Sequence, residues 1–329
     1  MIYQVSFLIS LVIMVLIISM NANYSIHHVL FTVSVAIGAG GYLCMSLSYN
    51  LEEAILANKI SYVLGMFAPM LLFMLVCEIS QVRIPPIATA IMYTIQVLEF
   101  LCACTIGYSK IYYTDVVYRR EDGIVWLEKT YGPLHNLYLI SLVVYMFGGM
   151  IVAALALKKK NMVSQMDMDI ILGTDFLAFA AYCVERIVDL SVELMPLIFV
   201  EVDIVIFIAV TKIKLYSVMD NQDFIAGKMS GTGYMVFDKK LKFKGSNDLM
   251  RAVFPEAGQW EIDRKVPGSG GRFNTYLRQP LRSYIQEGKG EPELGDSFEL
   301  DDKTYSWRIS RLLGMGGRHR GYVVEIIES

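Results

Sequence analysis

Long apolar runs separated by short polar segments fill the first two thirds of the chain. Seven of them are long enough for a helix to cross the hydrocarbon core, which takes roughly 20 residues. The predicted spans are Ile2–Met20, His28–Ser48, Ala57–Ile79, Pro85–Tyr108, Pro133–Leu157, Met168–Val188 and Met195–Tyr216. The first run lacks the basic leader and small-residue cleavage site of a signal peptide, so we expect a retained helix. The pattern predicts an all-α seven-helix transmembrane bundle over residues 1–217.

The loop between the fourth and fifth runs, residues 109–131, has a pattern of its own. Aromatic and β-branched residues stand on both sides of Asp122-Gly123. Asp-Gly between two such runs is a strong hairpin signal. We expect an extracellular β-hairpin that caps the mouth of the bundle, with a plain exposed linker as the alternative.

Basic residues indicate how the bundle is oriented, because lysine and arginine concentrate in cytoplasmic loops. The informative ones are Arg83, Lys158, Lys159, Lys160, Lys212 and Lys214. The loops Tyr49–Leu56 and Asp189–Leu194, on the other side, contain no lysine or arginine. We therefore expect a multi-pass protein of the cell membrane with its N-terminus outside and its C-terminal part in the cytoplasm.

Short mixed segments replace the long runs after Asp220. The expected elements are a helix over 219–229, strands over 233–238 and 240–247, a helix over 248–256, a helical stretch over 272–288 and three strands within 296–313 and 320–329. Asn247 or Asp248 caps the second helix, and Pro280 should break or kink the third. Turns are expected at Asp301-Asp302 and Gly314–Gly317. The pattern predicts an α+β domain over residues 218–329.

Composition sharpens this division. The 329 residues are 55% apolar and 19% charged, whereas soluble domains carry about 25% charged residues. Residues 1–216 contain 28 charged residues, and the last 113 contain 33. The first part therefore has the lipid bilayer as its partner. A net charge of −3 gives no global field for nucleic acid, which we exclude as a partner.

Cysteine and histidine give no sign of a metal, a cofactor or a catalytic site. The five cysteines lie in apolar runs, and the four histidines lack ligand spacing. Retinal needs a lysine in the middle of the last helix, but Ile204–Val210 offers no amine. A flavin photoreceptor needs a cysteine beyond Cys183, and a haem would find only His319, in a turn expected to be exposed.

Charged residues inside the predicted spans are the best candidate for a functional site, since such groups face the bundle interior or a water-filled cavity. Those at similar depth in the outer half are Lys59, Glu99, Glu185, Arg186, Asp189, Glu201 and Asp203. They could form a pocket open to the outside for a small polar or cationic ligand, or pair with one another to fix helix packing. Glu201 and Asp203 are two residues apart, so we expect at most one to point fully inward.

Three stretches resemble a known family, the seven-helix region N-terminal to bacterial histidine kinases and diguanylate cyclases. They are Leu51–Ser80, Tyr131–Tyr138 and Val188–Val210. An acidic stretch leads into the third helix and Pro69 lies near its middle, as in that family. The resemblance covers about the first 220 residues. It implies a sensor that passes an extracellular signal to a cytoplasmic effector, and it brings no catalytic residues.

Residues 233–256 resemble the opening of a PAS domain, in which two strands precede an asparagine that enters a helix. The resemblance implies a dimerisation and relay module, and a small-ligand pocket is the alternative. We found no histidine kinase phosphoacceptor segment, no ATP-binding region and no Gly-Gly-Asp/Glu-Glu-Phe signature. Enzymatic output is therefore expected on a partner or a continuation of the chain.

Together these observations predict a non-enzymatic membrane receptor. It would sense an extracellular small molecule and signal through a PAS-like domain, as a homodimer with a cytoplasmic effector. The alternatives are a membrane transporter or channel, and the N-terminal fragment of a sensor histidine kinase or diguanylate cyclase.

Overall fold

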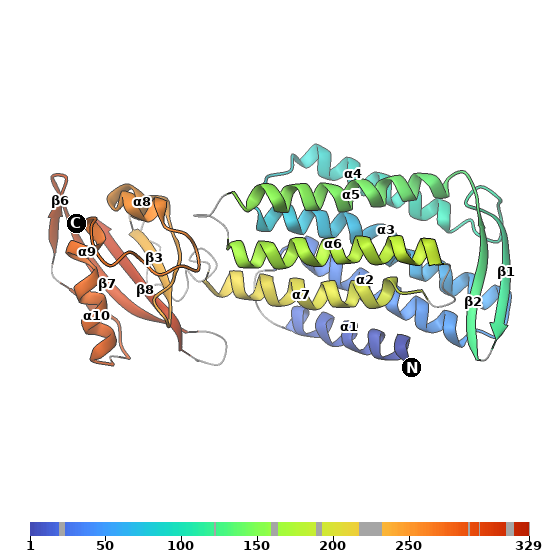
Figure 1. The fold of residues 1–329 in the computed structure, drawn as a ribbon, viewed down its shortest axis with the longest axis horizontal. Coiled ribbons are helices and arrows are strands. Elements are labelled where there is room, and N and C mark those ends of the chain that lie inside the picture. The colour runs from blue at the N-terminus through green and yellow to red at the C-terminus, as the bar shows by residue number, and fades with distance from the viewer. Residues whose placement is uncertain are drawn as a thin grey trace. The chain divides into compact units, whose positions relative to one another are not determined.

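The computed structural model describes residues 1–19, 24–121, 123–158, 164–188, 193–216, 232–288, 290–295, 297–313 and 319–328, without the side chains of residues 165, 186 and 212–216. The chain divides into two compact units. The first comprises Met1–Leu155 and Met168–Ile208, and the second Ala156–Asp167 and Ala209–Ser329. The first unit is helical with one hairpin, and the second is rich in β-sheet (Figure 1).

The first three helices are α1 (Ile2–Ser19), α2 (Ile26–Leu47) and α3 (Leu51–Ile79). Polar caps set where the second and third begin, because a side-chain oxygen satisfies a free N–H group of the first turn. Ser25 Oγ accepts from the His28 N–H at 3.3 Å. Asn50 Oδ1 accepts from the Glu53 N–H at 2.9 Å. This cap explains why α3 starts at Leu51, before the apolar run predicted from Ala57.

Helices α2 and α3 pack unusually closely at two glycines. A Cβ on Gly38 would lie 2.1 Å from the Leu64 Cβ, and one on Gly41 would lie 2.5 Å from the backbone nitrogen of Ser61. Small residues let helix backbones approach each other in a membrane, where packing drives association.

The remaining helices of this unit are α4 (Pro86–Ala103), α5 (His135–Ala156), α6 (Gln165–Val188) and α7 (Met195–Tyr216). Within the described residues, helices α1 to α5 are long and apolar enough to cross a membrane. Each predicted span overlaps one of the helices α1 to α7, whereas the crossing of the membrane by α6 and α7 stays a prediction. Helix α4 ends at Ala103, before the predicted Tyr108, in a turn that contains Gly107 at φ 84°.

The hairpin predicted between the fourth and fifth helices is confirmed. Strands β1 (Tyr113–Glu121) and β2 (Ile124–Tyr131) pair antiparallel, with Glu121 opposite Ile124. Gly123, directly before β2, has a φ of 79°, which glycine readily adopts. The hairpin lies across one end of the helix bundle (Figure 1). Its position on the outer face of the membrane stays a prediction.

The second unit contains an antiparallel sheet. Its strands are β3 (Thr232–Asp238), β4 (Phe243–Ser246), β5 (Glu293–Leu294), β6 (Phe298–Leu300), β7 (Lys303–Leu313) and β8 (His319–Glu328). The order is β4-β3-β8-β7-β5, and β6 also pairs with β7. Asp301 and Asp302 form the predicted turn, with φ of 51° and 61°. The short strand β5 was not predicted. The expected helix over 219–229 and loop at Gly314–Gly317 lie outside the described residues.

Short helices cover this sheet: α8 (Asp248–Val253), a 3-10 turn (Pro255–Gln259), α9 (Arg272–Tyr276) and α10 (Arg278–Gln286). Of the two predicted caps, Asn247 is the one observed, and it accepts a hydrogen bond from the Met250 N–H at 3.0 Å. The predicted break lies at Leu277, so Pro280 falls in the first turn of α10, where a missing N–H costs little. A core that includes Phe237, Phe254 and Tyr284 fills the space between sheet and helices.

Candidate functional site

Aromatic side chains gather where the hairpin meets the helix bundle. The members, which we call the tyrosine cluster, are Tyr62, Tyr112, Tyr113, Tyr131, His135 and Tyr138. The rings of Tyr131 and His135 stack with centroids 3.9 Å apart, and Tyr62 meets Tyr112 edge-on at 5.2 Å. The hydroxyls of Tyr62 and Tyr113 share a hydrogen bond. The cluster therefore ties β1 to α3 and α5.

Burial favours the protonated form of Tyr112 and Tyr113, the tyrosines on the hairpin side of this cluster. It raises the pKa of both Tyr112 and Tyr113, because the phenolate would lose its hydration. Both hydroxyls therefore stay protonated at neutral pH. The cluster offers hydroxyl groups and aromatic faces, and such faces attract cations.

An ion pair lies beside the tyrosine cluster and links the hairpin to the helix bundle. Lys129 Nζ on β2 is 2.5 Å from Glu193 Oε1, in the segment that leads into α7. The side chains are only 11% and 22% exposed. Burial by itself would lower the pKa of Lys129, but the Glu193 carboxylate outweighs it and raises that pKa above the ordinary value. Lys129 is therefore charged at neutral pH.

Three further side chains extend this pair into a wider set, the Lys129–Glu193 network. The Glu193 N–H donates to the Tyr3 hydroxyl at 3.1 Å, and the Tyr42 hydroxyl donates to the Glu193 carboxylate. The Leu194 N–H donates to Glu185 Oε2 at 3.0 Å. The network thus joins the hairpin to α1, α2, α6 and the start of α7.

The charged residues predicted from the sequence are distributed over several contacts. Glu185 belongs to the Lys129–Glu193 network, whereas Lys59 lies over the Tyr108 ring at 4.5 Å from its centroid. Glu99 is 4% exposed and accepts from the Ser141 hydroxyl, which is 2.8 Å from each carboxylate oxygen. Asp189 and the side chain of Arg186 lie outside the described residues.

The two acidic residues of α7 point in different directions. Asp203 is fully buried and accepts from Thr32 Oγ1 on α2 at 2.7 Å. Glu201 is exposed. The expectation that at most one of them points inward is confirmed. Lys59, Glu99 and Asp203 each have a different partner, and their convergence with Glu185 on a single pocket stays a prediction.

The sequence reasoning missed Lys129, Glu193, Tyr3 and Tyr42. A signal for Lys129 was available, because alternate residues of a strand share one face. Val125 and Leu127 are buried on β2, and Lys129 continues that series. The other three residues belong to α1, α2 and the segment before α7, and their contacts join elements that are distant in the sequence.

Comparison with known proteins bears on the helical unit. Residues 2–219 match the family described as the N-terminal 7TM region of histidine kinase. That region is not itself catalytic. Among curated proteins, none matches the chain. The match covers two thirds of the 329 residues and agrees with several helices apolar enough to cross a membrane. The chain is a membrane protein and belongs to the family that carries the N-terminal 7TM region of histidine kinase.

Proposed function

We propose that this protein is a membrane receptor that senses a small extracellular ligand at the hairpin end of its helical unit. The family supports a membrane sensor. The hairpin end supplies protonated tyrosine hydroxyls, aromatic faces and an ion pair, a set suited to a small polar or cationic ligand. In the proposal, the charged residues predicted in the outer half of the bundle lie around this region and enlarge the binding site. They are Lys59, Glu99, Glu185, Arg186, Asp189, Glu201 and Asp203.

The observation that carries the proposal is the contact between Lys129 and Glu193. It joins the hairpin, which would meet an arriving ligand, to the start of α7. Helix α7 is the last helix of the bundle, and the chain continues from it into the second unit. A ligand that favours a different position of the hairpin would thereby favour a different position of α7.

We place the hairpin and the N-terminus outside the cell. The Tyr3 hydroxyl contacts Glu193 at the hairpin end, so the start of α1 and the hairpin lie on the same side of the bundle (Figure 1). Arg83 and the run of three lysines from 158 to 160 follow helices that end on the opposite side. The positive-inside rule then puts residues 218–329 in the cytoplasm.

The second unit acts in this proposal as a PAS-like relay that forms homodimers and passes the signal to a cytoplasmic effector. The order of its elements supports this role. Two paired strands come first, Asn247 then enters α8, and β6, β7 and β8 close the sheet after the helices.

A spin label on α7 tests the coupling. Lys214 is replaced by cysteine in a background without the native cysteines, labelled, and studied in lipid nanodiscs. Lys129→Met should change the mobility of the label because the hairpin no longer holds the start of α7. The charge swap Lys129→Glu with Glu193→Lys should restore the original spectrum.

The control is Arg119→Met, which removes an exposed ion pair from the same hairpin and should leave the spectrum unchanged. Identical spectra for the protein with and without Lys129 would contradict the coupling. Flux of a small solute across liposomes containing the purified protein would instead identify a transporter or channel.

A further inference from the structure

A cavity of about 250 Å³ opens in the second unit beside α10. Apolar side chains, including Phe237, Phe273 and Leu281, form part of its lining. The rest of the lining is basic and comprises Lys240, Lys265, Arg278 and Arg282. No acidic residue is among the described residues that line it. The cavity therefore combines an apolar wall with an excess of positive charge.

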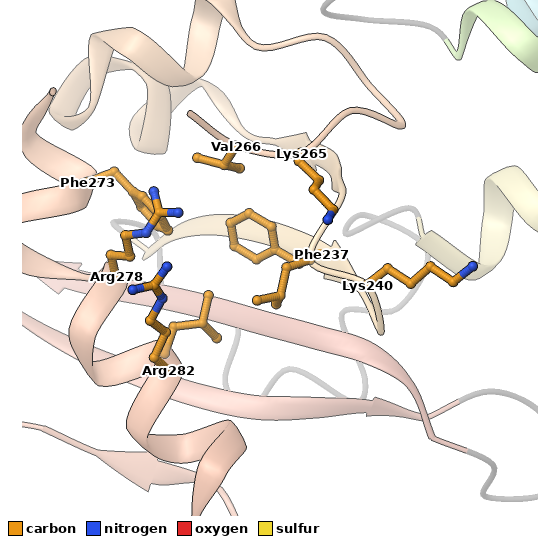
Figure 2. A pocket seen from close by; sticks show the side chains of 9 residues that line it. Phe237, Lys240, Lys265, Val266, Phe273, Arg278 and Arg282 are labelled. Carbon is orange, nitrogen blue, oxygen red and sulfur yellow. The ribbon is translucent and has the colours of Figure 1, made fainter. Parts of the chain in front are cut away.

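The positive charges converge on one part of the cavity. Arg278 and Arg282 are four residues apart on α10 and share a face of that helix. Figure 2 shows their guanidinium groups near each other and Lys265 across the cavity from them, whereas the Lys240 side chain extends away. Across the described part of the chain, none of these four cations forms an ion pair with a carboxylate. Their mutual repulsion is thus not offset by an acidic side chain.

The helix adds to this positive potential. Arg278 is the first residue of α10, at the end where the helix dipole is positive and cations are disfavoured. The first turn contains no acidic residue. Burial lowers the pKa of Arg278, and the nearby charge of Arg282 lowers it further. Arg278 is nevertheless held in place, because its Nη1 donates to Pro267 O and Asn274 Oδ1.

We propose that this cavity binds a small organic anion, a phosphate monoester or a dicarboxylate. A guanidinium group matches a carboxylate or phosphate with two parallel hydrogen bonds. Two such groups side by side suit a ligand with two negative charges, and Phe237 and Phe273 would pack against its carbon atoms. The ligand would remove the repulsion between the arginines and link α10 to the segment that contains Lys265.

This site goes beyond the sensing of an extracellular ligand, since it belongs to the C-terminal unit. An anion that binds the folded state but not the unfolded state would stabilise the folded protein by mass action. The second unit would then respond to a small-molecule signal of its own, and the receptor would combine two inputs.

Titration of the full chain in nanodiscs of zwitterionic lipid tests the proposal, with glycerol 3-phosphate and succinate as probes followed by calorimetry. We expect saturable binding of at least one probe. Arg282→Gln should raise the Kd of that probe by about tenfold or more, because one charge-assisted contact is lost. Arg282 is exposed and no hydrogen bond from it is seen among the described residues, so this substitution should leave the fold intact. Arg282→Lys should retain part of the affinity.

Lys303→Gln is the matched control, because it also removes one positive charge but lies on β7, outside the cavity lining. It should bind the probes like the unaltered chain. An equal loss in Lys303→Gln and Arg282→Gln would overturn the proposal, and so would the absence of saturable binding of both probes. Binding only to vesicles that contain phosphatidylglycerol would also overturn it, in favour of a contact with the membrane surface.

Discussion

Removal of Lys129 is the sharpest test of the architecture at the hairpin end. Lys129→Met keeps much of the aliphatic stem and deletes the charge that faces Glu193 at 2.5 Å. The Glu193 side chain is only 22% exposed, so little water can replace the lost ammonium group. The remaining carboxylate would keep the bond from the Tyr42 hydroxyl but lose its counter-charge.

The expected cost follows from the burial of the pair. Truncation of one partner of a fully buried ion pair costs about 3 to 5 kcal/mol, because an uncompensated charge stays inside. Partial exposure of Glu193 and its hydrogen bond from the Tyr42 hydroxyl reduce this cost. We therefore expect Lys129→Met to lower the free energy of unfolding by about 2 kcal/mol. The Arg119–Glu128 pair on the same hairpin is 49% and 61% exposed, so Arg119→Met should cost below about 1 kcal/mol.

A double-mutant cycle isolates the interaction itself. Unfolding in mixed micelles is measured for Lys129→Met, Glu193→Gln and the double variant, beside the corresponding cycle for Arg119 and Glu128. The Lys129–Glu193 coupling should exceed the Arg119–Glu128 coupling by at least about 1 kcal/mol. Equal coupling energies for the two pairs would refute the reasoning that burial makes the Lys129 contact strong.

The same pair predicts a dependence of stability on pH. The pKa of Lys129 in the folded protein is raised above its ordinary value of about 10.4. Its contribution is therefore fully present below the ordinary value and is lost as the pH rises through the folded-state pKa. The unaltered protein should lose stability more steeply than Lys129→Met in this alkaline range. Parallel curves would contradict this assignment.

The other predictions concern packing and capping, and each is measured by unfolding of the full chain. Gly41→Ala should cost about 1 to 3 kcal/mol because its Cβ would meet the backbone of α3, whereas Gly173→Ala meets open space and should be neutral or slightly stabilising. Asn247→Ala removes three hydrogen bonds that join β3 to α8 and should cost about 2 kcal/mol. Arg308→Met should cost about 3 kcal/mol because it leaves the Glu325 carboxylate, 1% exposed, without its counter-charge. Replacement of both partners by apolar residues should recover most of that loss.

Apolar periodicity predicted the elements of this protein well because each depends on local sequence. Each predicted span overlaps a helix of the first unit, and the hairpin turns at Gly123 as its backbone preference requires. Asn247 caps α8 for the same local reason. The start of α3 was missed because Asn50 caps a helix whose first turn carries Glu52 and Glu53. A search for apolar residues alone cannot find such a start.

The candidate site was less accessible, because its contacts join residues that are distant in the chain. Lys129 and Glu193 are separated by 64 residues, and Tyr3 and Glu193 by 190. The depth of a charge along its predicted span carries no information about which face of a helix meets which neighbour. Asp203 therefore meets Thr32 on α2, although its depth alone placed it with Glu185.

Two buried carboxylates bear on the proposed transmission of movement from the hairpin to α7. Glu99 binds Ser141 and so joins α4 to α5, the two helices that the hairpin connects. Asp203 binds Thr32 and so joins α7 to α2. A carboxylate deep in a bundle keeps its hydroxyl partner because an unpaired polar group in a low dielectric is costly, so each pair of helices should move as a unit. Lys129 and Glu193 connect the first of these pairs, through the hairpin, to the second. In the proposed mechanism, displacement of the hairpin would therefore act on α7.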